Sequence, residues 1–138
     1  MSDEEQDTAA AQGDPDPSPL RLALESGPKM VFATALDWPG WCRRAKGEMA
    51  AIDRLLDYAP RYEVILRRAG LALPAAYQAQ IVERLPGGAG TEFGAPGALA
   101  EDERRPMEAA EAGRRARILA AAWEAFDAVA AAAPAALR

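Results

Sequence analysis

Residues 37–43 read DWPGWCR and contain the side chains of this sequence best suited to chemistry. Cys42 is the only cysteine of the chain, and a run of basic residues follows it directly. Nearby positive charge favours a thiolate, so Cys42 is a candidate thiol nucleophile. A thiol-dependent enzyme would also need acid–base groups. The candidate carboxylates for that role are Asp37, Glu83 and Glu92.

The absence of histidine argues against this reading. None occurs among the 138 residues, which removes the commonest general base and the commonest metal ligand. Ser-His-Asp and Cys-His catalysis and histidine-containing zinc sites are therefore excluded within this chain. A lone cysteine in a strand is usually a small buried hydrophobic residue. We expect no catalytic residues, no metal site and no cofactor, with Cys42 as an alternative reactive thiol.

The aromatic residues are the better candidates for binding. Tryptophan and tyrosine bury a large apolar surface while keeping one hydrogen-bonding group, so they suit an apolar pocket with polar handles. The alternative is that they fill a core short of large side chains, since about a quarter of the chain is alanine. The predicted ligand- or partner-binding residues are Trp38, Trp41, Tyr58, Tyr62 and Phe93.

Charge and composition limit the classes of partner that this chain is expected to bind. A net charge of -5 and a pI near 4.8 oppose general attraction to phosphate backbones, so we expect no nucleic-acid binding. We therefore expect Arg43, Arg44 and Lys46 to be solvated side chains at the end of a strand rather than a nucleic-acid-binding patch. The single cysteine gives no internal disulfide, no apolar run is long enough to span a bilayer, and the N-terminus is acidic. We expect a cytoplasmic protein, with a protein partner, a homo-oligomer or a small-molecule ligand all open.

The pattern of the chain predicts three parts. Residues 1–19 are acidic and rich in Asp-Pro pairs, which is typical of a disordered tail. Residues 20–100 predict a small α+β domain, and residues 101–138 predict a long C-terminal helix that packs on this domain or on a partner.

Within the domain, residues 30–36 (MVFATAL) are β-branched and aromatic and predict a strand. A Pro-Gly turn then leads into a short returning strand over residues 41–45. Residues 20–24 suit a strand or a short helix equally, and residues 77–85 favour a strand over a helix. Together these segments predict a small antiparallel sheet over residues 20–45 and 77–85.

Two amphipathic helices are predicted to pack on this sheet, over residues 48–58 and from Pro60 to the stop at Gly70. Residues 86–100 are glycine-rich and predict a surface loop anchored by Phe93, with a ligand-contacting loop as the alternative. The helix over residues 101–133 carries a broad apolar stripe that is more often core than a cofactor site. Glu111 and Arg115 are spaced on it to form an i, i+4 ion pair. This stripe can also seek a partner helix.

The stretch from Val31 to Leu56 resembles HicB-like domains, which are antitoxin-type modules. The matching positions are Pro39-Gly40, Cys42, Gly47 and Glu48, but Gly47-Glu48-Met49-Ala50-Ala51 departs from the usual Gly-Thr-x-Glu-Glu-Ala signal. No DNA-binding segment follows. The chain from Val31 onward also resembles an uncharacterised family of small proteins from high-GC bacteria. Members of that family are longer, so the resemblance implies that this chain is a short or truncated member. The motifs that carry this resemblance are DWPGWCR (37–43), YAPRY (58–62), VERLPG (82–87), FGAPG (93–97) and AAPAALR (132–138).

The sequence thus predicts a non-catalytic ligand-binding or protein-interaction module. The first alternative, implied by the HicB-like resemblance, is an antitoxin or regulatory partner without its DNA-binding segment. The second alternative is a thiol-dependent enzyme that uses Cys42.

Overall fold

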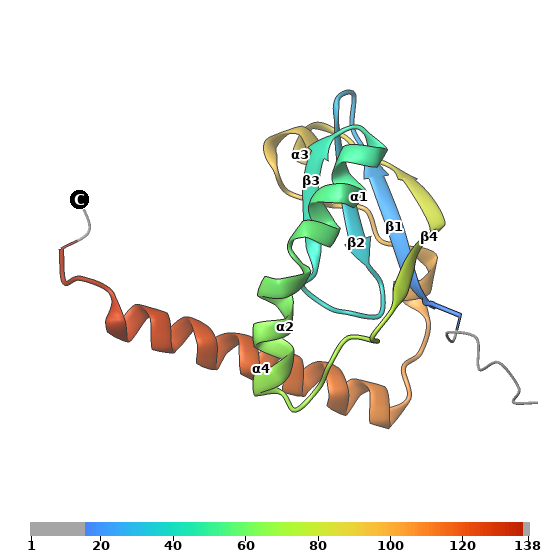
Figure 1. The fold of residues 1–138 in the computed structure, drawn as a ribbon. Coiled ribbons are helices and arrows are strands. Elements are labelled where there is room, and N and C mark those ends of the chain that lie inside the picture. The colour runs from blue at the N-terminus through green and yellow to red at the C-terminus, as the bar shows by residue number, and fades with distance from the viewer. Residues whose placement is uncertain (1–15, 137–138) are drawn as a thin grey trace, which may run out of the picture.

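The computed structural model describes residues 16–136 as a four-stranded sheet with two helices on one face and a long helix across its end (Figure 1). The α+β class and the long C-terminal helix are confirmed. The predicted tail lies outside the described residues up to position 15, and its last two residues already belong to β1. The elements are β1 (Ser18–Ser26), β2 (Met30–Ala35), β3 (Cys42–Lys46), α1 (Glu48–Asp57), α2 (Ala59–Arg68), β4 (Tyr77–Pro86), α3 (Ala89–Phe93), a 3-10 turn (Glu101–Arg104) and α4 (Ala109–Ala132).

The sheet is mixed, which corrects the prediction of an antiparallel sheet. Its strand order is β3-β2-β1-β4, with antiparallel pairs β1–β2 and β2–β3 but a parallel pair β1–β4. The cause is the connection between β3 and β4. There α1 and α2 carry the chain over one face of the sheet to its opposite edge, and β4 starts again in the direction of β1 (Figure 1). With the helices toward the viewer this crossover moves from left to right, the usual right-handed sense.

The main core lies between the sheet and these two helices. Leucines at alternate positions of β1 point into it, as the alternation predicted, and the choice left open for residues 20–24 is settled as a strand. From α1 and α2 the spacing of three and four residues delivers Ile52, Leu55, Tyr62 and Leu66 to the same space. The sheet face of this core contains Leu20, Leu22, Leu24, Val31, Ala33, Ala35 and Trp41.

A bulge in β4 changes which side chains reach this core. The ladder pairs Leu22 with Ile81 but Ala23 with Glu83, so Val82 is an extra residue. Up to Ile81 the odd-numbered residues of β4 pack with the helix-covered face, as Tyr77 and Ala79 do. Beyond the bulge the phase reverses, and Leu85 packs against the opposite face beside Ala23. Simple alternation over residues 77–85 would have placed all the odd-numbered residues on one face.

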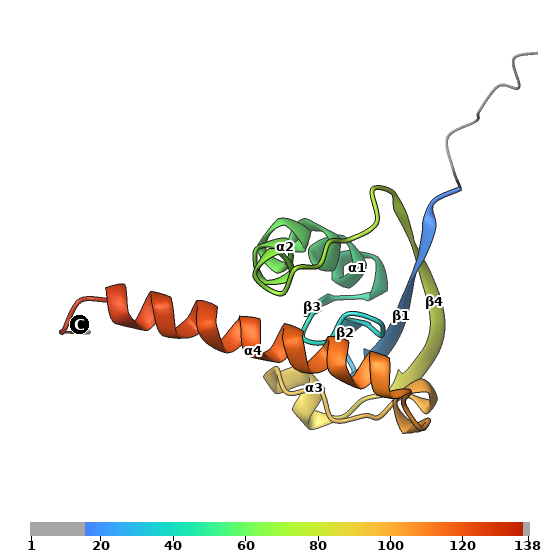
Figure 2. The ribbon, with the colours of Figure 1, turned by 90° about the horizontal axis from the view of Figure 1, so that it is seen from below.

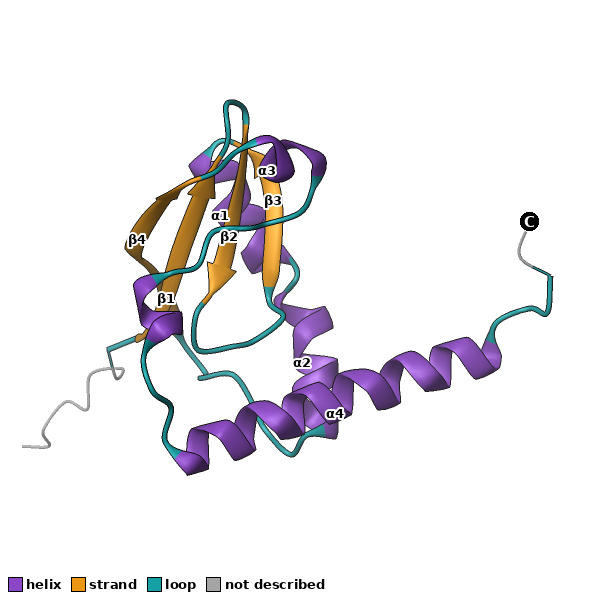
Figure 3. Cartoon of the chain, turned by 180° about the vertical axis from the view of Figure 1, so that it is seen from behind, coloured by secondary structure: helices purple, strands orange, loops and turns teal. Residues whose placement is uncertain are grey.

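The opposite face is covered by the segment after β4, which contradicts the prediction of a loop without structure. This segment forms α3 and the 3-10 turn and runs across the back of the sheet (Figure 3). Gly87 allows the close approach, because a Cβ there would lie 2.3 Å from Thr91 Oγ1 and 2.9 Å from the carbonyl of Ser26. Phe93, the expected anchor, is 87% exposed, whereas Thr91 is buried.

The C-terminal helix begins at Ala109, eight residues later than predicted, because Pro106 follows the 3-10 turn and residues 106–108 are not helical. Its first half passes under the end of the sheet beside α2, and its second half extends away from the domain (Figure 2). The predicted Glu111–Arg115 pair is present, with a 2.9 Å contact. Arg115 also donates to the carbonyl of Leu36 at 3.0 Å and so attaches α4 to the β2–β3 corner.

The bulge yields a test of the sheet register. Deleting Val82 would leave Glu83 in its present phase after Ile81, so we expect the deletion to lower the free energy of unfolding by no more than about 1 kcal/mol. Deleting Ala23 from the central strand has no such compensation. It turns leucines out of the core, and we expect a loss of about 3 kcal/mol or more in urea denaturation. Equal losses for the two deletions would contradict the assigned register.

Candidate functional site

The Pro-Gly corner is a tight turn built around packed aromatic rings. Trp41 N donates to Trp38 O at 3.2 Å, with Pro39 and Gly40 at the two central positions and a φ of 86° at Gly40. Proline sets the first of these positions and glycine accepts the positive φ of the second, as the sequence predicted. Tyr62 fixes the turn from α2, because its hydroxyl donates to Pro39 O at 2.8 Å.

The structure places Trp41 inside the core. Its side chain is 2% exposed, its Nε1 donates to Leu55 O at 2.8 Å, and its ring stacks on Tyr62 with centroids 5.4 Å apart. Tyr62 is 9% exposed, and its burial raises the pKa of the phenol to about 12. Neither ring offers a free face to a ligand, so these two residues fill the core, which is the alternative that the alanine-rich composition suggested.

The other three predicted binding residues each have different neighbours. Trp38 is half-buried and packs edge-to-face with Tyr62. The guanidinium of Arg114 lies over its ring, 4.9 Å from the centroid. Tyr58, at the end of α1, is covered by Arg43 at 3.9 Å. Phe93 lies at the end of α3. The five aromatic residues therefore do not line one pocket, although Trp38, Trp41 and Tyr62 are in contact.

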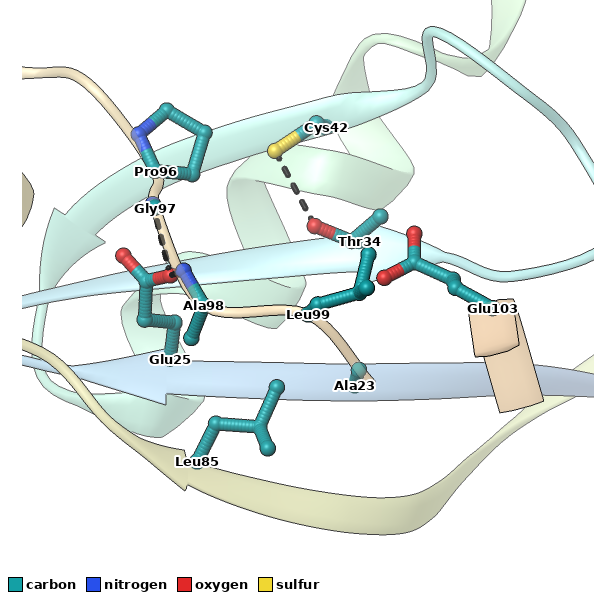
Figure 4. A pocket seen from close by; sticks show the side chains of 10 residues that line it. All are labelled: Ala23, Glu25, Thr34, Cys42, Leu85, Pro96, Gly97, Ala98, Leu99 and Glu103. Atoms are coloured by element: carbon teal, nitrogen blue, oxygen red, sulfur yellow. Dashed lines mark hydrogen bonds between the residues drawn. The ribbon is translucent and has the colours of Figure 1, made fainter. Parts of the chain in front are cut away.

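Cys42 points the other way, into a recess on the back face of the sheet (Figure 4). The recess has a volume of about 360 Å³, between the central strands and the covering segment after β4. Its lining contains two carboxylates, Glu25 and Glu103, and otherwise small or apolar groups. The lining residues are Ala23, Glu25, Thr34, Cys42, Leu85, Pro96, Gly97, Ala98, Leu99 and Glu103.

The surroundings of Cys42 keep its thiol protonated. Partial burial raises the pKa of this thiol, and the hydrogen bond with Thr34 (Sγ–Oγ1 3.1 Å) and the charge of Arg43 offset only part of the rise. The cations that follow Cys42 are turned elsewhere, since Arg43 lies on Tyr58 and Arg44 donates to the carbonyl of Thr91 at 3.3 Å. The expected activation of the thiol by neighbouring charge is therefore weak here.

Glu25 holds the covering segment against the sheet. It is 5% exposed, and its carboxylate accepts hydrogen bonds from Thr91 Oγ1 at 2.8 Å, Gly97 N at 2.9 Å and Ala98 N. Glu25 lies on the outer face of β1, where it lines the recess, and no local signal in the sequence shows that distant residues bury this face. A carboxylate with three donors is already satisfied, so Glu25 acts as an anchor for this segment.

The remaining carboxylate candidates also form structural contacts outside the recess. Asp37 forms an ion pair with Arg21 at 2.8 Å. Glu92 accepts the backbone N–H groups of Lys29 and Met30 at 2.7 and 2.8 Å, and these bonds lower the pKa of its carboxyl group. Glu83 accepts Glu101 N at 2.8 Å. None of the three lines the recess around Cys42.

The most prominent unpaired surface lies on α4. Leu119, Trp123, Phe126 and Val129 are each at least 60% exposed, and the rings of Trp123 and Phe126 meet edge-to-face with centroids 6.1 Å apart. We call these four residues the α4 apolar face. Only Ile118 and Ala121 of this helix are buried, so the predicted core stripe is largely exposed. The reason is that α4 extends past α2, and nothing in the described part of the chain covers its second half (Figure 2).

Comparison with known proteins identifies no relative of this chain. No protein-family model, curated protein or solved structure matches this chain. Within residues 16–136, no cluster of three or more potential ligand side chains suits a metal ion. In the same range, no helix has the length and apolarity required to cross a bilayer.

The chemistry of Cys42 is testable through its pH dependence. Because the pKa of the thiol is raised, we expect alkylation by iodoacetamide at neutral pH to be at least about tenfold slower than for the unfolded chain. The rate should begin to rise at a higher pH than for a free cysteine. Thr34→Val removes a hydrogen bond to the thiolate and should raise the pKa further. Folded-state labelling as fast as in guanidinium chloride would contradict this environment.

The anchoring role of Glu25 is testable by amide exchange. Glu25→Ala leaves the hydroxyl of Thr91 and two amides without an acceptor, so we expect a loss of about 2 kcal/mol of stability or more and faster hydrogen exchange at Gly97 and Ala98. Glu25→Gln keeps an acceptor and should give a smaller change. Unchanged exchange at both amides in Glu25→Ala would disprove this role.

Proposed function

We propose that this chain is a non-catalytic protein-interaction module and that the α4 apolar face is its docking surface. One observation carries the proposal: four large apolar side chains, two of them aromatic, lie exposed on α4, and three of them belong to the half that extends away from its own domain. Such contiguous apolar patches are uncommon on monomeric proteins and usually mark interaction sites. Tryptophan is also the residue type that most often dominates binding energy at interfaces.

The arrangement of the rest of the chain supports this choice over catalysis. The thiol of Cys42 has a raised pKa, and both carboxylates of the recess are hydrogen-bonded to other groups: Glu25 accepts three donors, and Glu103 accepts Ala100 N at 2.9 Å. The N-terminal half of α4 is fixed by Arg114 and Arg115, both bonded to backbone carbonyls of the β2–β3 corner. A rigidly attached helix loses little entropy on binding, which favours affinity.

An antitoxin or regulatory role of the HicB-like kind is the second candidate. Its support is the order of elements around the corner: β2, a Pro-Gly turn, β3, Gly47 with a φ of 85°, and α1 beginning at Glu48. The positions that carry the resemblance, Pro39-Gly40, Cys42, Gly47 and Glu48, lie in the turn and at the ends of these elements. A stable complex with a basic protein encoded beside this chain would favour this candidate.

The docking surface is testable by site-specific photo-cross-linking in the native host. A photoreactive phenylalanine analogue at position 123 should give a discrete cross-linked product, whereas the same analogue at Met49 should not. Met49 is 71% exposed on α1 and serves as a matched control for exposure. Mass spectrometry of the product identifies the partner. Absence of a product at position 123 beyond that at position 49 would disprove the proposal.

A further inference from the structure

We infer that the α4 apolar face binds a second copy of this chain, through an antiparallel pairing of the two α4 helices about a two-fold axis at the level of Ala121 along the helix. This inference rests on the proposed function, because it names the partner of the same surface. Three features of α4 support it: the order of small and large side chains, the distribution of charge, and the direction in which the helix extends.

The small and large side chains of α4 follow a repeat of four and three residues, which is the spacing of a helix-pairing seam. Leu119, Trp123 and Phe126 occupy the middle of this seam, and alanines occupy both ends. The seam is separate from the buried contact with α2, because Leu119 lies about 100° around the helix from Ile118. All six seam residues are exposed. They are Ala112, Ala116, Leu119, Trp123, Phe126 and Ala130.

This order is self-complementary only when the two helices run in opposite directions. About Ala121, Trp123 of one copy lies opposite Leu119 of the other, and Phe126 lies opposite Ala116. Each aromatic ring then meets a smaller side chain, as close packing of helices requires. In a parallel pair Trp123 would meet Trp123 and Phe126 would meet Phe126, while the alanines at the ends would be held apart.

The charges on α4 favour the same direction. The first half, residues 109–120, has three arginines and one glutamate, a net charge of +2. The second half, residues 121–132, has Glu124 and Asp127 and no basic residue, a net charge of -2. Antiparallel pairing places each half against a half of opposite charge and also opposes the two helix dipoles.

The shape of the molecule leaves room for this pairing. The acidic half of α4 extends beyond the sheet and α2, and no other helix or strand of residues 16–136 lies beside it (Figure 2). At 1.5 Å per residue, the twelve residues from 121 to 132 extend over about 18 Å. An antiparallel pair sets the two domains at opposite ends of the helix pair and brings each free half alongside the first half of the other α4. The same patch is used by both copies, as a two-fold interface requires.

The test combines solution mass with the direction of pairing. Light scattering over a concentration series should show a dimer. Trp123→Ala and Phe126→Ala should each raise its dissociation constant at least about tenfold, while Met49→Ala should leave it unchanged. For direction, Cys42→Ser supplies a background without other thiols, and its fold is checked by circular dichroism. In that background Ala120→Cys, close to the axis, should cross-link to itself through a short bismaleimide, whereas Ala116→Cys should not. Ala112→Cys should react with a chain that carries Ala130→Cys, its opposite position in the antiparallel pair.

Each outcome bears on the inference. A monomer at every concentration, a dimer that Trp123→Ala and Phe126→Ala do not weaken, or efficient Ala116→Cys self-cross-linking would overturn it. The proposed function is judged separately by the photo-cross-link at position 123. A product containing a different protein, together with a monomer in solution, rejects the second copy but retains the docking surface. No product at all rejects both.

Discussion

The structure depends on one packed contact, the stack of Trp41 on Tyr62 between the sheet and its two helices. About a quarter of the residues are alanine, whose side chain buries too little area to fill the space between two layers. Trp41 supplies the missing volume, and its indole nitrogen is satisfied by the carbonyl of Leu55 on α1. Tyr62 then bonds to Pro39 across the turn, so the corner, α1 and α2 are fixed relative to one another by two rings.

A second constraint acts on the back of the sheet, where residues distant in sequence must be held against β1. The buried hydrophobic cluster on that face is small and consists of Ala23, Leu36 and Ala100. The carboxylate of Glu25 compensates by accepting three hydrogen bonds from the covering segment. A buried charge is tolerated when its hydrogen-bonding capacity is satisfied in this way. The recess beside Cys42 is what remains between this segment and the strands.

Local patterns in the sequence predicted what depends on neighbouring residues. The strand over residues 30–36, the Pro-Gly corner, the two amphipathic helices and the Glu111–Arg115 pair all follow from spacing of a few positions, and each is present. The parallel pairing of β4, the bulge at Val82 and the anchor at Glu25 depend on contacts between segments more than forty residues apart. Nothing in the local pattern encodes those contacts. For the same reason the sequence singled out Trp41 as a binding residue although it lies in the core.

The two apolar patterns of α4 show why periodicity alone does not distinguish a core from an interface. Ile118 and Ala121 are buried, whereas Leu119, Trp123 and Phe126 lie on another side of the helix and are exposed in the described part of the chain. Both sets follow helical spacing, so the sequence joined them into one stripe. The two sets differ in environment because α2 packs against the first half of α4 and does not extend along its second half. The apolar surface beyond that point is left for another helix, and the charge reversal along α4 selects one that runs in the opposite direction.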